Sequence, residues 1–179
     1  MKRAWLFILA LATATPAAGQ VAPASRAEGT GAMYPLGVLV GEWVGTSTTR
    51  TGPDTETSTY MREKAGFKAG GNVLVLEGMG THSENGHTRV VHDAYAAVTW
   101  NAEAEKYEMR AYRAGQGWVD TELSVADDGN TMQWGLESPA GSVRFTLDFS
   151  EADRWVEIGE IQRGGQWYPF LRMELDRVR

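Results

Sequence analysis

The chain has 179 residues, with 17 Lys and Arg against 23 Asp and Glu, and it contains no cysteine. The formal net charge of −6 argues against nucleic acid or an anionic membrane surface as a partner, because both attract basic protein surfaces. The lack of cysteine excludes disulfides, so a closed network of backbone hydrogen bonds must supply much of the stability.

The first residues have the pattern of a secretory signal peptide. Lys2 and Arg3 form a basic start, which an apolar core and a run of small residues follow. An apolar core of about ten residues is too short to span a bilayer, which needs about 20. We predict a signal peptide over residues 1–19 with cleavage after Gly19, or alternatively after Ala24. The sequence thus predicts a periplasmic or secreted protein without a membrane span.

The next segment, residues 20–35, is rich in Ala, Gly, Pro and Ser, which predicts a flexible linker. Residues 36–179 have the length of one domain. At the start of this domain, Leu36 and Leu39 have the spacing of one turn of helix, and strand-like patterns follow. We expect this short helical turn to close one end of the fold.

Turn signals divide the rest of the chain at short intervals. Asn85-Gly86, Asp128-Gly129 and Gly164-Gly165 are examples, and such pairs supply the positive φ angles that tight hairpins need. Nine turns separate ten strand-like segments, and no long helical period intervenes. This pattern predicts an all-β fold, an antiparallel up-and-down β-barrel of about ten strands.

The tight turns also predict which side chains face inward. If Asp128-Gly129 is a two-residue turn, Leu123 lies opposite Trp134, and the following turn places Trp134 opposite Phe145. These residues share a mainly apolar face, whereas the other face is polar, as in a sheet with one solvated side. We therefore expect them inside the barrel.

A two-residue turn at Gly164-Gly165 predicts the register of the last hairpin in the same way. Ile158 and Glu160 would then face the interior. Glu157 would lie outside, opposite Arg172. An exposed ion pair of this kind contributes about 1 kcal/mol or less to stability.

Two motifs allow a family comparison, Leu39-Val40-Gly41-Glu42-Trp43-x-Gly45 and Gly165-x-Trp167-x-Pro169-Phe170-Leu171. With ten strands between them, they resemble the calycin superfamily of lipocalins and fatty-acid-binding proteins, and more narrowly the bacterial lipocalin-like domains of unknown function. In that superfamily an Arg on the last strand packs across the motif Trp and closes one barrel end. The resemblance implies this closing role for Trp43 and Arg177, with Gly41 letting the backbone approach the ring.

The nitrobindin-type haem-binding barrels share the Gly-x-Trp-x-Gly opening. They hold haem through a His near the C-terminal end, whereas the last histidine of this chain is His92. We therefore predict that the protein has no haem and no other cofactor.

A closed barrel of this size leaves room inside for one small ligand. Adaptable Met side chains and broad aromatic faces suit a flat or flexible apolar molecule. The alternative is that the same side chains meet and fill the core. The predicted apolar lining comprises Met109, Leu123, Trp134, Phe145, Leu147, Ile158, Leu171 and Met173.

Two polar residues belong to the predicted ligand site. Glu160 would lie opposite Pro169, which has no N–H to offer, so a buried carboxylate there would need another partner or a raised pKa. His92 would have Glu77 diagonally beside it, and a Glu that orients a His is typical of a general base. The alternatives are an exposed rim position for Glu160 and a half-exposed structural role for His92.

His82, Glu84 and His87 would share one face near a hairpin tip. Two imidazoles and a carboxylate could hold Zn²⁺. Because hairpin tips are solvated and no second shell is evident, we predict no functional metal site.

The leading hypothesis is an exported barrel, monomeric or dimeric, that binds a small, mainly apolar molecule without transforming it. One alternative is an isomerase- or cyclase-like enzyme in which His92, Glu77 or Glu160 transfers protons. Another is a non-catalytic module that binds an envelope protein through its surface. An inward orientation of His92 or Glu160 would favour the enzyme.

Overall fold

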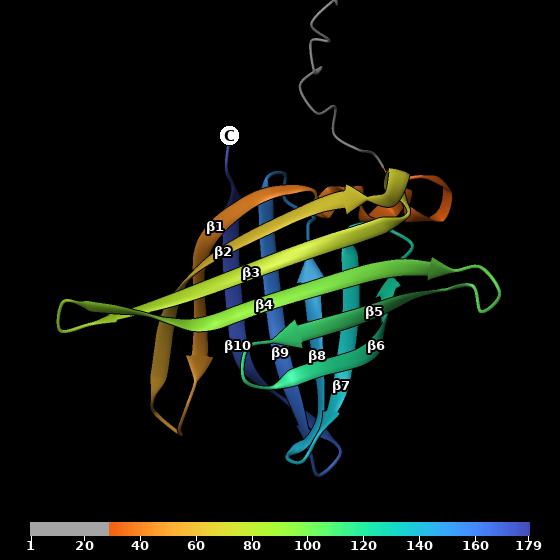
Figure 1. Cartoon of the computed structure of the whole chain (residues 1–179). Coiled ribbons are helices and arrows are strands. Elements are labelled where there is room, and N and C mark those ends of the chain that lie inside the picture. The colour runs from red at the N-terminus through yellow and green to blue at the C-terminus, as the bar shows by residue number, and fades with distance from the viewer. Residues whose placement is uncertain (1–28) are drawn as a thin grey trace, which may run out of the picture.

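The computed structural model describes residues 29–179. Residues 41–177 form ten antiparallel strands in sequential order, and β1 pairs with β10 to close the barrel (Figure 1). The predicted up-and-down barrel is thus confirmed. The elements are η1 (Gly31–Leu39), β1 (Gly41–Arg50), β2 (Glu56–Lys68), η2 (Ala69–Gly71), β3 (Val73–Glu84), β4 (His87–Asn101), β5 (Lys106–Arg113), β6 (Gly117–Val125), β7 (Thr131–Ser138), β8 (Gly141–Asp148), β9 (Arg154–Arg163) and β10 (Gln166–Arg177).

The 3₁₀-helix η1 lies at the same end of the barrel as the C-terminus, and the hairpins β1–β2, β7–β8 and β9–β10 turn at the opposite end (Figure 1). The predicted signal peptide, residues 1–19, lies outside the described residues. Residues 31–35, which the sequence assigned to the linker, form the first part of η1, where Met33 is 2% exposed. The end cap therefore begins before the predicted domain boundary. No helix in residues 29–179 is both long and apolar enough to cross a membrane.

Trp43 fills the end of the barrel that η1 covers. Its side chain is 1% exposed, and its indole Nε1 donates a hydrogen bond of 2.8 Å to the carbonyl oxygen of Leu39. The guanidinium carbon of Arg177 lies 3.9 Å from the centroid of the ring. This is the packing that the resemblance to calycins implies.

Arg177 also ties the last strand to the chain entering β1. Its guanidinium donates hydrogen bonds to the carbonyl oxygens of Val38 and Val40 and to the carboxylate of Asp153. Gly41 has a φ of 137°, and a Cβ atom there would lie 2.7 Å from Nη1 of Arg177. A side chain at position 41 would therefore displace the arginine.

Strands β6 and β7 form the weakest junction of the barrel wall. The predicted pairs Leu123–Trp134 and Trp134–Phe145 are confirmed, yet β6 and β7 pair over only three residue pairs, whereas β7 and β8 pair over eight. Beyond these pairs the side-chain hydroxyl of Thr121 donates to the carbonyl oxygen of Gly135. The two strands separate at this point, which we call the β6–β7 seam.

The last hairpin departs from the predicted register at a β-bulge. The expected pairing holds as far as Glu160 opposite Pro169, and there the register shifts because Phe170 is an extra residue on β10. Leu171 consequently pairs with Gly159 rather than with Ile158. Because Pro169 lies on the outer face and Leu171 on the inner face, the inner and outer faces of β9 are exchanged along the whole strand relative to the prediction.

Ile158 and Glu160 therefore lie on the outer face of the barrel, and their prediction as interior residues is wrong. Glu160 forms an ion pair with Arg144, with 2.7 Å between Oε2 and Nε. The guanidinium carbon of Arg144 lies 4.2 Å from the ring centroid of Trp167. The carboxylate of Glu160 is thus paired with Arg144 on the outer surface of the barrel.

Candidate functional site

The interior of the barrel is packed in one part and open in another. Most inward-facing apolar side chains near η1 and at mid-height are buried, whereas several toward the opposite end are only half-buried although they face inward. Inward-facing apolar side chains therefore fill the barrel toward η1 and keep part of their surface exposed toward the opposite end. Met109, Leu123, Leu147 and Met173 are buried, and Trp134, Phe145 and Leu171 are half-buried.

Three aromatic rings line the open part, and we call Trp134, Phe145 and Phe170 the aromatic wall. Trp134 and Phe145 stack with centroids 4.3 Å apart, and Phe170 meets Phe145 edge-on with centroids 6.0 Å apart. Gly159 makes room for them, because a Cβ atom there would lie 2.9 Å from Phe145 and 3.1 Å from Phe170. Phe170 faces inward only because of the bulge, so strand alternation could not have identified it.

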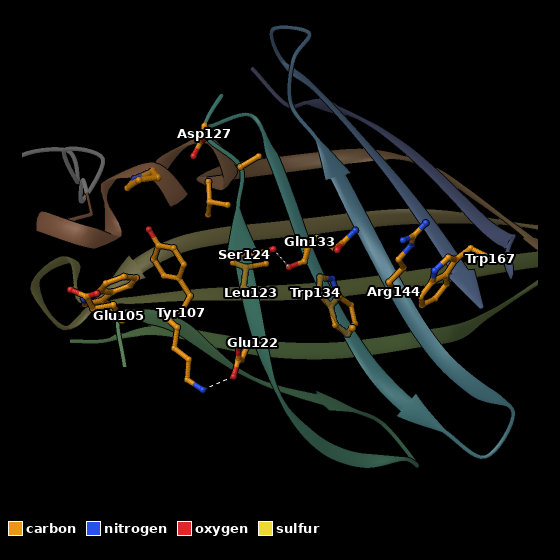
Figure 2. A pocket seen from close by; sticks show the side chains of 17 residues that line it. Glu105, Tyr107, Glu122, Leu123, Ser124, Asp127, Gln133, Trp134, Arg144 and Trp167 are labelled. Atoms are coloured by element: carbon orange, nitrogen blue, oxygen red, sulfur yellow. Dashed lines mark hydrogen bonds and ion pairs between the residues drawn. The ribbon is translucent and has the colours of Figure 1, made fainter. Parts of the chain in front are cut away.

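A cavity of about 810 Å³ lies along the β6–β7 seam. Inner-facing Tyr107, Leu123 and Trp134 line it together with outer-facing residues such as Arg144 (Figure 2). The cavity thus touches side chains of both faces of the wall, and Trp134 is the one member of the aromatic wall that lines it.

A carboxyl group that the sequence analysis did not single out, that of Glu63 on β2, faces the interior. Glu63 alternates with the buried Met61 and Ala65 and pairs with Gly78 on β3. A Cβ atom at Gly78 would lie 2.6 and 2.7 Å from the two carboxylate oxygens, so the glycine leaves the space that the carboxyl group occupies. Burial, together with the charge of Glu157, raises the pKa of Glu63 to about 8. The alternation of apolar residues along β2 was the sequence signal that could have identified Glu63 as an interior residue.

Glu157 on β9 is the second interior carboxyl group. The bulge in β10 turns it inward, so its predicted ion pair with Arg172 does not form, and Arg172 pairs with Glu174 instead. Burial raises the pKa of Glu157 to about 7, and the indole of Trp155 acts in the opposite direction. No local pattern revealed this orientation, because the sequence does not mark the extra residue on β10.

Neither Glu63 nor Glu157 has a cationic partner in the part of the chain that the structure describes. Both side chains face the interior, although two strands, β10 and β1, separate β9 from β2, and the charge of Glu157 contributes to the raised pKa of Glu63. We call them the carboxyl pair.

His92 faces inward opposite Gly80, but Glu77 lies exposed on the outer face, opposite Tyr95. The predicted His92–Glu77 arrangement is therefore wrong. The reason is a register shift between Gly80 and Thr81, which moves His92 by one position relative to β3. Burial lowers the pKa of His92, and the charge of nearby Arg113 lowers it further.

At the tip of the β3–β4 hairpin Glu84 pairs with His87, and His82 Nδ1 lies 2.8 Å from the carbonyl oxygen of Ser58. Within residues 29–179, no three side chains of the metal-ligating types are grouped closely enough to hold an ion. Strands β5 to β10 contain no histidine, so the haem ligand of nitrobindin-type barrels has no counterpart there.

The outer surface carries a row of exposed aromatic side chains across β4, β5 and β6. Tyr95 and Tyr112 are each 41% exposed and Trp118 is 64% exposed. Their ring centroids are 6.3 Å apart between the tyrosines and 6.4 Å apart between Tyr112 and Trp118. We call these three residues the outer aromatic row.

Neither a protein-family model nor a curated protein sequence matches this chain. Among solved structures, the chain is similar to Rv2717c from M. tuberculosis, with a TM-score of 0.61 and 13% identity over 85% of this chain and 100% of that one. It is also similar to the S-type phycobiliprotein lyase CPES from Guillardia theta, with a TM-score of 0.53 and 11% identity over 79% of this chain and 89% of that one. At such identities the likeness concerns the fold alone. The protein is accordingly a closed ten-stranded antiparallel β-barrel, similar in fold to both of these structures.

Proposed function

We propose that the protein is an exported barrel that binds a small, mainly apolar molecule in its interior, without a cofactor and without transforming that molecule. The observation that carries this proposal is the aromatic wall, whose rings face inward and yet remain half-buried. A ligand against this wall would remove its remaining apolar surface from water, which favours binding.

The β6–β7 seam is the proposed route of access. Strands β6 and β7 share three residue pairs, whereas β7 and β8 share eight. Trp134 lines the cavity at the seam. A ligand entering there reaches the aromatic wall without opening the end that Trp43 and η1 close.

The proposal predicts that the protein binds a neutral apolar dye such as Nile red, and that Trp134→Ala weakens this binding about tenfold. The expected factor corresponds to the loss of one aromatic contact. Fluorescence titration measures both affinities. Trp118→Ala is the matched control, because it removes the same side chain from the outer surface, and it should leave dye binding unchanged.

Binding of the dye by neither the wild type nor the control variant would count against an interior ligand site. A second measurement uses no variant: native mass spectrometry of the protein isolated from the periplasm or medium of its own source. A reproducible excess mass that is lost on denaturation would reveal a carried molecule and its class.

Export is part of the same proposal and rests on the sequence of residues 1–19. We expect the intact mass of the isolated protein to correspond to cleavage after Gly19 or Ala24. A full-length mass in the cytoplasmic fraction would contradict export while leaving the interior site intact.

The enzymatic alternative keeps one supporting observation, the inward orientation of His92. Glu77 and Glu160 both lie on the outer face, so neither orients His92 and neither reaches the interior. A conversion of the carried molecule that His92→Gln abolishes would favour this alternative.

The surface-interaction alternative is supported by the outer aromatic row, which is exposed in a single copy of the chain. We expect a monomer or dimer. Light scattering coupled to size-exclusion chromatography over a range of concentrations measures the state, and a dimer that dissociates in Trp118→Ala would place its interface on this row.

A further inference from the structure

The carboxyl pair is the least compensated polar feature of the barrel interior. A carboxylate taken out of water is costly unless a cation or several hydrogen-bond donors replace the lost hydration. Glu63 lies among the apolar residues of β2, and Glu157 lies between Leu147 and Met173 of the neighbouring strands. Neither has a cationic partner among residues 29–179. The charge that would balance the pair is thus absent from the described part of the chain.

One further polar group near the pair also lacks a partner in the described part of the chain. The indole Nε1 of Trp155 makes no hydrogen bond, although Trp155 is 3% exposed, and its effect on Glu157 shows that it is directed toward that carboxyl group. Buried polar groups normally find partners, so an indole without one beside two carboxyl groups without a cation indicates a missing occupant.

We infer that Glu63 and Glu157 anchor the protonated nitrogen of a mainly apolar ligand. This inference rests on the proposed function and adds the chemical class of its ligand, an apolar amine. Once the ligand is bound, the carboxylates accept hydrogen bonds from its N–H groups. Glu157 in its charged form also becomes an acceptor that the indole of Trp155 can use.

The position of the pair determines how such a ligand lies. Leu147 is opposite Glu157 on β8, and Phe145 is the next inward-facing residue on that strand, so the aromatic wall begins beside the carboxyl group. The nitrogen lies at the pair, and the apolar part extends along Phe145 and Trp134 toward the β6–β7 seam. Gly78 and Gly159 supply the space for the carboxyl group of Glu63 and for the aromatic rings.

The remaining ionisable groups on inner-facing positions leave the pair uncompensated. Arg177 is engaged with Trp43 and Asp153 at the closed end. The inner-facing positions of β1, β6, β7 and β8 carry no ionisable side chain. Those of the other strands, besides the carboxyl pair and Arg177, are His82 and Glu84 on β3, His87, Arg89 and His92 on β4, Tyr107 and Arg113 on β5, Arg163 on β9 and Tyr168 on β10. Six of them, Glu84, His87, Arg89, Arg113, Arg163 and Tyr168, are exposed at the ends of their strands.

The experiment compares three ligands with the same chain, octylammonium, octanol and octanoate, by isothermal titration calorimetry of the purified protein at pH 8. We expect octylammonium to bind at least about tenfold more tightly than octanol, the factor of one charge-assisted hydrogen bond, and octanoate to bind most weakly. The double variant Glu63→Gln, Glu157→Gln should reduce the affinity for octylammonium to that for octanol and leave octanol binding unchanged.

The matched control is Glu84→Gln, Glu103→Gln, which makes the same change in net charge on the surface, where both residues are exposed. It should keep the preference for octylammonium. Equal affinities for octylammonium and octanol, or a preference that survives in the interior variant, would overturn the inference while leaving apolar binding intact. If none of the three ligands binds, the proposed function fails together with it.

A second readout uses the wild type alone. Burial keeps protons on the carboxyl pair near neutral pH, so a bound cation must release them. Titrations with octylammonium at pH 7 in phosphate and in Tris should therefore differ in heat by the ionisation of the buffer, and affinity should rise from pH 6 to pH 9. Binding without proton release would contradict the anchoring site.

Discussion

Trp43→Ala is expected to lower the free energy of unfolding by about 3–5 kcal/mol, the usual cost of removing a large buried aromatic side chain. Trp43 is 1% exposed, and its ring packs against Phe149 and Trp155 with centroids 5.9 Å away in both cases. The change would also remove the hydrogen bond to Leu39 and the surface on which Arg177 lies. Chemical denaturation measures the loss.

The size of this effect should depend on what replaces the indole. Trp43→Phe retains much of the packing but not the hydrogen bond, so a smaller loss, about 1–2 kcal/mol, is expected. Trp118→Ala removes an indole that is 64% exposed and should change stability by about 0.5 kcal/mol or less. If Trp43→Ala lowered the free energy of unfolding no more than Trp118→Ala does, the stability of the barrel end would not depend on the ring of Trp43.

The second large effect is on the pH dependence of stability. The pKa values of Glu63 and Glu157 in the folded protein, about 8 and about 7, lie above the ordinary value of 4.5 that applies on unfolding. Above pH 4.5 the unfolded chain therefore releases protons that the folded protein retains. The stabilising contribution is complete below pH 4.5 and is lost as the pH rises through 7 and 8. We expect the ligand-free protein to lose a few kcal/mol between about pH 5 and pH 9.

The variant Glu63→Gln, Glu157→Gln should abolish most of this loss and make the ligand-free protein more stable than the wild type at pH 9. Urea denaturation at pH 5, 7 and 9 measures the effect, with Glu84→Gln, Glu103→Gln as the surface control. His92 has a lowered pKa and acts in the opposite sense below pH 6.5, so the comparison with the variant isolates the carboxyl pair. Parallel curves for wild type and interior variant would show that the carboxyl groups reach water freely.

An apolar amine should alter this pH dependence. Because it binds the charged form of the pair, its stabilisation should be larger at pH 9 than at pH 5, and it should thereby offset the loss seen in the empty protein. The pH dependence of this stabilisation and the proton release measured by calorimetry both report the coupling between amine binding and deprotonation of the carboxyl pair.

Local sequence patterns predicted most of the barrel wall. Tight turns such as Asp128-Gly129 specify the pairing of their flanking strands, and the period of two in a strand then decides which residues share a face. For this reason the Leu123–Trp134 and Trp134–Phe145 pairs were predicted correctly. The resemblance carried by the Gly41–Trp43 motif further implied the packing of Arg177 across Trp43 at the closed end.

The candidate site was less predictable because it depends on departures from that period. One extra residue at Phe170 exchanges the faces of β9, so Glu157 rather than Glu160 reaches the interior. A shift near Gly80 likewise separates His92 from Glu77. Glu63 is different, since it stands between Met61 and Ala65 in an otherwise apolar alternation, and the pattern of β2 places it inside without reference to any other strand.

The sequence by itself determined an all-β chain and its ten strands, because these follow from turn chemistry and from the period of each strand, and the family resemblance implied the residues that close one end. Only the tertiary structure decided that Glu157 faces the interior together with Glu63 and that β6 and β7 separate beside Trp134. The physical reason differs for the two features. Glu63 and Glu157 lie on strands that are not neighbours in a hairpin, whereas β6 and β7 separate where their pairing is interrupted. Such relations depend on bulges and on how the sheet closes, and neither leaves a periodic signal in the chain.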